Sequence, residues 1–260
     1  MTRSLTQQEH SSLSAHLCGH QDAERIKQLL SENAKEISSV FVTLDSHQRM
    51  HIAHGVFWQD AAGKHPDPFT LISVADVESG KWRAVNEADQ EPARAYVKEL
   101  ERDGRFKLCI WPEHCIIGTA GHNVTAPVNE GLDQWIGSTH GAVDWVHKGQ
   151  NVHTEMYSAL KAEVAIESDP STSLNRGLVE RLSRFERILV CGQAKSHCVN
   201  FTVRDLVDNL AWPKEQMNRI WLLEDAMSSV TTFEQEGEQF IADMQAAGLT
   251  VTTTDKAFAS

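Results

Sequence analysis

The first residues that could do chemistry are an acid and several imidazoles that follow predicted strands. Asp45 ends the apolar run VFVTLD, and His47 lies two residues further on, so on extended chain both side chains point to the same side. His114 follows a second apolar run. These three side chains could bind Zn²⁺, Fe²⁺ or Mn²⁺ and leave positions open for water or substrate. His54 or His51 could add a ligand, although each taken alone reads as a loop imidazole, and surface hydrogen bonding is the plainer alternative for the whole set.

A cysteine lies where a predicted strand meets a predicted helix. The apolar run Ile188–Val190 is interrupted by Cys191-Gly192, and apolar residues then recur at helical spacing from Val199. The turn between them directs backbone N–H groups and the positive end of a helix dipole at one point, where Cys198 lies. Thiolates are nucleophiles, and a helix N-terminus lowers the pKa of a thiol. Cys198 is therefore a candidate nucleophile, although a small core residue would explain the same position.

Two further strand ends carry groups that could work beside a thiol. Lys148 follows a strand predicted at 142–146, and its ammonium would favour a nearby thiolate, although such a lysine is ordinarily a solvated charge. Trp111 ends the run LCIW and could either contact an aromatic ligand or belong to the core. His197 neighbours Cys198 in sequence but points elsewhere on a helix start, so Lys148 is the preferred partner of the thiol.

Helices and strands that alternate along the chain must position these residues. The helices are expected at 21–37, 91–103, 126–136, 173–184, about 199–211 and 232–247, and the strands at 40–45, 108–111, 142–146, 188–190, 220–224 and 249–253. Such alternation requires crossover connections and parallel pairing. The predicted fold is α/β, with three α/β/α layers and a mainly parallel sheet whose ligand site lies at the carboxyl ends of the strands.

Length and local composition predict one domain with two irregular segments. A chain of 260 residues can bury a single large core. Residues 1–12 form a polar leader with no strand signal. The segment 46–90 is predicted to be loop-rich, because Gly63, Pro66, Pro68 and Gly80 interrupt regular structure. The segment 58–107 is read as an insertion that could cover the site as a lid.

Composition limits the partners and the compartment. A formal net charge of −12 and a pI near 5.5 argue against nucleic-acid and membrane partners, which would need clustered Lys and Arg. No apolar run is long enough to cross a membrane, and the N-terminus lacks the charge pattern of a signal peptide. Five cysteines without CxxC spacing predict free thiols in a reducing compartment, hence a cytoplasmic protein. A small-molecule partner and a homo-oligomer are compatible with this composition.

Together, these motifs resemble those of the nicotinamidases, which are isochorismatase-like cysteine hydrolases. The resemblance covers about 13–230 and rests on VTLDSH, WPEHCIIGTAGH, the Lys-Gly pair at 148–149 with Tyr-Ser-Ala at 157–159, and GQAKSHCV. It implies hydrolysis of nicotinamide, or a related carboxamide, to nicotinate and ammonia through a thioester on Cys198. Lys148 would favour the thiolate, and the backbone N–H groups of Ala194 and Cys198 would hold the oxyanion. A non-proline cis peptide bond would fall at Gln193-Ala194.

The resemblance also implies a metal and a substrate pocket. Asp45, His47 and His114 would bind a divalent metal, with His54 as a further ligand; zinc is the first choice, and iron or manganese are alternatives. The open position of the metal would take the pyridine nitrogen. Trp111 would stack on the substrate ring, and Tyr157 would also line the pocket. The reaction would belong to pyridine nucleotide salvage in NAD metabolism.

One departure from the family pattern concerns the N-terminus. Nicotinamidases begin with a central apolar strand that ends in a catalytic Asp, whereas residues 1–9, MTRSLTQQE, hold neither, and Glu9 is not assigned this role. The loss of that strand would leave two sheet edges with unpaired backbone groups. Little or no turnover of nicotinamide is expected from a chain without this general base. Two alternatives follow: a non-catalytic or N-terminally incomplete homologue that only binds ligand, or a metal-free carbamoyl or ureido amidase of the same superfamily.

Overall fold

The structure is a computed structural model that describes residues 7–102 and 107–259, with side chains described from residue 19 onward. Its contacts divide the chain into two compact units. Unit 1 contains the described residues up to Val42, then Val124–Trp145 and the residues from Arg176. Unit 2 contains Thr43–Asn123 and Val146–Asn175. Each unit is described by itself, and the expectation of one domain stays a prediction.

Unit 1 is built on a three-stranded parallel sheet. The strands β7 (Ile188–Val190), β8 (Ile220–Leu223) and β9 (Thr250–Thr252) pair in that order. Parallel neighbours need crossover connections, which α6 (Asn200–Asn209) and α7 (Glu234–Ala246) supply. The predicted strand at 188–190 is confirmed without change, and the predicted amphipathic face of α6 is buried. The α/β fold class is therefore confirmed.

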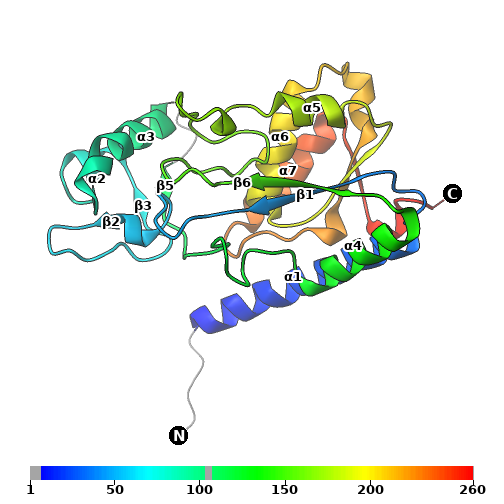
Figure 1. Cartoon of the computed structure of the whole chain (residues 1–260), viewed down its shortest axis with the longest axis horizontal. Coiled ribbons are helices and arrows are strands. Elements are labelled where there is room, and N and C mark those ends of the chain that lie inside the picture. Colours follow the sequence, from blue (N-terminus) through cyan, green and yellow to red (C-terminus); the bar gives the residue numbers. More distant parts are fainter. Residues whose placement is uncertain (1–6, 103–106, 260) are drawn as a thin grey trace, which may run out of the picture. The chain divides into compact units, whose positions relative to one another are not determined.

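Two long helices of unit 1 pack along each other, α1 (Gln7–Glu32) and α4 (Ala126–Thr139) (Figure 1). The predicted bounds of the first helix, 21–37, are wrong at both ends. Residues 7–20 are polar, contain no proline and are helical. At the other end, the side chain of Asn33 donates to the carbonyl of Leu29, just after the last helical residue. α5 (Arg176–Leu182) completes the helices of this unit among the described residues. None of the helices in the described residues is both long and apolar enough to span a membrane.

Unit 2 has its own core and more regular structure than predicted. The segment 46–90, expected to be loop-rich, also contains β2 (Trp58–Gln59), β3 (Leu71–Ile72), α2 (Val74–Glu78) and β4 (Arg83–Ala84). Strands of two residues have no periodicity to read, so these elements were not predicted. β2 pairs with β4, and β3 pairs with β5 (Leu108–Cys109), both antiparallel. The buried face of α3 (Gln90–Arg102) packs onto these strands in one apolar cluster.

The last two strands, β1 (Val40–Asp45) and β6 (Val143–Lys148), pair with each other (Figure 1). The predicted single sheet is therefore not continuous among the described strands. β1 has β6 as its only described strand neighbour, and β7 has only β8. Residues 7–32, which precede β1, are helical, and residues 1–6 lie outside the described part. β7, which has one described strand neighbour, is half-buried.

The close contact between α1 and α4 gives a test of the fold. A Cβ on Gly131 would lie 2.8 Å from the Cα of Lys27, so Gly131→Ala should lower the free energy of unfolding by about 1–3 kcal/mol. Gly137, in the same helix, has nothing within 4 Å of such a Cβ, and Gly137→Ala should raise stability by up to about 1 kcal/mol. Urea unfolding of both variants measures the difference. Equal effects would contradict the close packing.

Candidate functional site

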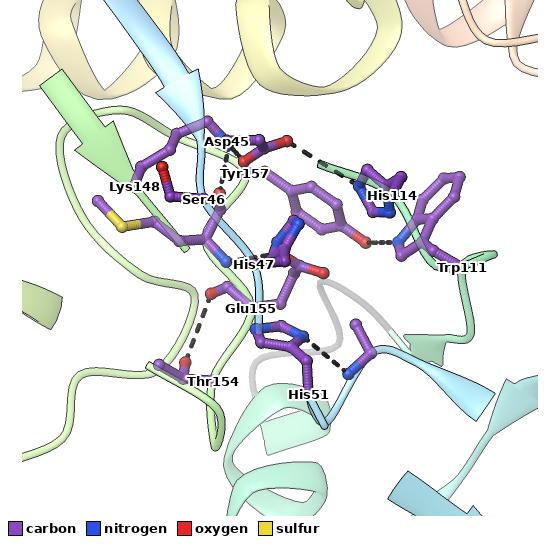
Figure 2. Close-up of polar contacts among 12 residues, drawn as sticks. Asp45, Ser46, His47, His51, Trp111, His114, Lys148, Thr154, Glu155 and Tyr157 are labelled. Carbon is purple, nitrogen blue, oxygen red and sulfur yellow. Dashed lines mark hydrogen bonds and ion pairs between the residues drawn. The ribbon is translucent and has the colours of Figure 1, made fainter. Parts of the chain in front are cut away.

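Four imidazoles of unit 2 form one cluster, partly visible in Figure 2. His47, His51 and His54 are at most 1% exposed, and the side chain of His114 is 37% exposed. The ring centroid of His47 lies 4.7 Å from the centroids of His51 and His114, and 5.3 Å from the centroid of His54. Among the described side chains, one ring nitrogen each of His51 and His54, and both of His47, are buried without a hydrogen-bond partner.

Backbone pairing between two loops creates this cluster. His47 forms a parallel bridge with Ile116, and His54 forms one with Trp111. The backbone N–H of His47 donates to the carbonyl of Cys115, and that of Trp111 donates to the carbonyl of Ala53. The loop after β1 and the loop after β5 are thereby held side by side, which brings His114 to the other histidines.

Hydrogen bonds to backbone carbonyls fix the ring tautomers of two histidines. Nδ1 of His54 lies 3.1 Å from the carbonyl oxygen of Arg49, and Nδ1 of His114 lies 2.9 Å from that of Pro112. A carbonyl only accepts, so each Nδ1 carries the proton and each Nε2 keeps its lone pair. Burial and the neighbouring imidazoles lower the pKa of both histidines, which favours the neutral form that binds metals.

These donors fit a divalent metal. Ligand atoms of His47, His54 and His114 lie within 4.8 Å of one another, and a second set with that spacing is His47, His51 and Glu155. Neutral imidazole is a common ligand of zinc, iron and copper. Buried nitrogens without partners are costly, and a bound ion would satisfy them. The cluster could therefore hold a metal. It brings together three of the four predicted ligands, His47, His54 and His114, and their role as ligands stays a prediction.

Glu155 is the member of this region that the sequence did not predict. It is 4% exposed, and its Oε1 lies 3.5 Å from Nε2 of His47 and accepts from the backbone N–H of Met156 at 2.9 Å. Burial opposes its ionisation, but His47, His51 and Lys148 outweigh burial and hold the pKa of Glu155 well below its usual range. The only sign of Glu155 in the sequence was an acidic residue between Lys148 and the Tyr-Ser-Ala motif. No spacing in the sequence connects Glu155 with His47.

Asp45 pairs with Lys148 and is not in either three-residue set (Figure 2). Lys148 is 4% exposed, and its ammonium donates to Oδ1 of Asp45 at 2.5 Å and to the carbonyl of Met156 at 2.7 Å. The other carboxylate oxygen of Asp45 lies 4.0 Å from Nε2 of His114. The structure thus brings the predicted catalytic lysine to the edge of the histidine cluster, and metal ligation by Asp45 stays a prediction.

An aromatic row adjoins the cluster. Nε1 of Trp111 donates to the hydroxyl of Tyr157 at 3.0 Å, and Phe69 packs edge-on to Trp111 with centroids 5.8 Å apart. Phe69 is 51% exposed, in a backbone conformation with φ of 67° that side chains rarely adopt. The two predicted substrate-binding residues therefore touch each other, and Phe69 is an exposed aromatic neighbour that the sequence did not single out.

Cys198 and Ala194 belong to unit 1. The peptide bond Gln193-Ala194 is cis, which confirms that prediction, and Cys198 lies in the single π-helical turn Lys195–Val199 that leads into α6. The side chain of Gln193 donates to Asp22 of α1 at 2.5 Å. Cysteines with described side chains form no disulfide. The expectation that the thiol of Cys198 faces Lys148 stays a prediction, because the two lie in different units.

Asp22 is a second buried acid that the sequence did not predict. It is 4% exposed and accepts hydrogen bonds from Gln193 and from the hydroxyl of Ser228, each at 2.5 Å. The carboxylate thus joins α1 to the segments that follow β7 and β8. Its position on a polar helix gives no sequence signal, because long-range partners determine its role.

Comparisons with known proteins identify the fold. No protein-family model matches the sequence, and no match is found among curated proteins. A nicotinamidase/pyrazinamidase of Acinetobacter baumanii is 21% identical, with a TM-score of 0.58 over 90% of this chain and 86% of that chain. The chain has the nicotinamidase fold. Yeast nicotinamidase gives 17% identity and a TM-score of 0.58 over 90% and 88% of the two chains. The pyrazinamidase of Pyrococcus horikoshii in complex with zinc is 16% identical, with a TM-score of 0.50 over 90% of this chain and 86% of that chain.

A nicotinamidase fold with a buried histidine cluster should be stabilised by zinc. At a free zinc concentration of about 100 times Kd, binding contributes about 2.7 kcal/mol, so Tm should rise by about 5–10 °C relative to chelator-treated protein. His114→Ala should abolish this shift. His65→Ala, which removes an exposed imidazole of the same unit, should preserve it. Calorimetry with and without zinc measures the shift, and its absence from the native sequence would exclude this metal site.

Proposed function

We propose that this protein is a cysteine amidohydrolase that converts nicotinamide, or a related aromatic carboxamide, to the acid and ammonia. The observation that carries the proposal is the histidine cluster beside the Lys148–Asp45 pair in a chain with the nicotinamidase fold. The cluster also favours this reaction over that of a metal-free carbamoyl or ureido amidase, which has no use for convergent imidazoles. Soluble nicotinamidases work on small molecules, so the substrate is the expected partner.

The reaction would begin at the thiolate of Cys198. Its sulfur attacks the carboxamide carbon, the carbon–nitrogen bond breaks, and ammonia leaves with the proton that the thiol gave up. Water then attacks the thioester carbon, which releases the carboxylic acid and returns a proton to the sulfur. The net reaction consumes one amide and one water and yields one acid and one ammonia.

The chain's own groups would stabilise the charges of these steps. Backbone N–H groups of Ala194 and Cys198 would bind the oxyanion, and such a donor contributes about 3 kcal/mol to the transition state. The ammonium of Lys148 would favour the thiolate over the thiol. Trp111 would stack on the substrate ring, with Tyr157 behind it. His47, His54 and His114 would hold a divalent metal, with Asp45 as a further candidate ligand, and the metal would bind the pyridine nitrogen and orient the ring.

The second candidate function is binding without turnover. The first Asp in the sequence is Asp22, and its carboxylate is already hydrogen-bonded to Gln193 and Ser228. The general-base role that the resemblance implies therefore has no assigned residue. A positioned base contributes about 10²–10⁴-fold to the rate, so turnover on nicotinamide is expected to be slow.

Cysteine variants separate the two functions. Cys198→Ala should lower ammonia release from nicotinamide by about three orders of magnitude or more, because it removes the nucleophile. Cys191→Ala should keep the native rate, because burial and two nearby carboxylates raise the pKa of the Cys191 thiol to about 12 and leave it unreactive. A coupled ammonia assay measures both. Nicotinamide binding with no ammonia release from the native sequence would instead support the ligand-binding function.

A further inference from the structure

Glu155 and His51 form the buried side of the histidine cluster, and the proposed function gives neither of them a role. Glu155 is 4% exposed and His51 is fully buried. In Figure 2, the contact between His47 and Glu155 is a dashed line, with His51 next to them. Within the described residues, the ion pair of Glu155 is the one with His47. A buried carboxylate needs positive charge nearby, which His47, His51 and Lys148 supply to Glu155.

Two donor sets share His47, and one neutral imidazole has one lone pair to give. The first set is His47, His54 and His114; the second is His47, His51 and Glu155. Only one of them can bind an ion through His47 at a time. The tautomers of the other histidines decide which.

His51 presents a proton to this region and not a lone pair. The backbone N–H of Ala53 donates to its Nδ1 at 3.2 Å. A neutral His51 therefore carries its proton on Nε2, and Nε2 is the atom that lacks a hydrogen-bond partner. His54 and His114 have the opposite arrangement, with Nε2 unprotonated. The first set offers lone pairs to a metal, and the second offers N–H groups to a carboxylate.

We propose that Glu155 is a positioning residue that orients His47 for metal binding. Its Oε1 lies 3.5 Å from Nε2 of His47, so with a metal bound it would accept Nε2–H and leave the Nδ1 lone pair of His47 for the metal held by His54 and His114. The protonated Nε2 of His51, which lies in the same three-residue set, would be a second donor to this carboxylate. Ligand histidines commonly have such a carboxylate partner, which fixes the tautomer and increases ligand basicity. The metal would in turn compensate the buried charge of Glu155 through His47.

This role rests on the metal site of the proposed function and not on amide hydrolysis, so zinc affinity tests it directly. Glu155→Gln keeps the shape, but the amide can present an N–H to Nε2 of His47 and draw the lone pair to the wrong nitrogen. Competition with a chromogenic chelator should show zinc binding about 10–100-fold weaker. Glu167→Gln removes the same charge from an exposed residue of unit 2 and should leave affinity unchanged. Equal affinities of the native protein and Glu155→Gln would overturn the proposal.

A second pair of variants distinguishes a positioning residue from a ligand and does not depend on the folding of Glu155→Gln. His51→Gln, which can still accept from Ala53 and donate to Glu155, should retain zinc, whereas His114→Ala should lose it. With cobalt in place of zinc, visible absorption of the bound ion should be present in His51→Gln and absent in His114→Ala. Zinc lost in His51→Gln but retained in His114→Ala would make His47, His51 and Glu155 the ligands and refute the positioning role. If zinc binding changes as expected in these variants but the native protein releases no ammonia, the positioning role of Glu155 stands and only the proposed amidase activity is contradicted.

Discussion

The structure of unit 2 depends on how buried imidazole nitrogens and one buried carboxylate are compensated. His47, His51, His54 and Glu155 are all buried, with at most 4% of each residue exposed. Each unsatisfied buried polar group costs about 1–3 kcal/mol, so a chain does not gather them without a partner. Under the proposed arrangement, a cation on one side of His47 and the carboxylate on its other side would satisfy the same ring from both edges. The metal and Glu155 would then stabilise each other electrostatically through His47.

The backbone around His47 explains a sequence motif. Gly149 has φ of 75°, and a Cβ there would lie 2.9 Å from Nε2 of His47. A side chain at this position would be strained and would collide with the His47 ring. The glycine after Lys148 therefore permits the ammonium to reach Asp45 while the imidazole stays in place. The Lys-Gly pair, noticed in the sequence only as part of a resemblance, has a steric reason.

Features determined by residues close together in the sequence could be predicted, and features determined by distant residues could not. β1 and β7 were located without error because short apolar runs bounded by polar residues or glycine determine them locally. The two-residue strands β2, β3 and β4 and the early start of α1 have no periodic signal, so they were missed. β5 lies within the predicted strand 108–111. His47, His54 and His114 could be grouped because each follows a strand end. Glu155 and Asp22 could not be found, because their partners are distant in sequence and only the folded chain brings them together.

The proposed metal binding and the proposed turnover depend on residues of different units. Every imidazole of the cluster, Glu155, Lys148 and Asp45 lie in unit 2, whereas Cys198 and the cis peptide lie in unit 1. The contacts of the histidine cluster are made by described residues of unit 2. The cluster can therefore bind a metal whether or not a base is present to deprotonate the thiol. A zinc-loaded protein would establish the site, and only the dependence of ammonia release on Cys198 would establish the enzyme.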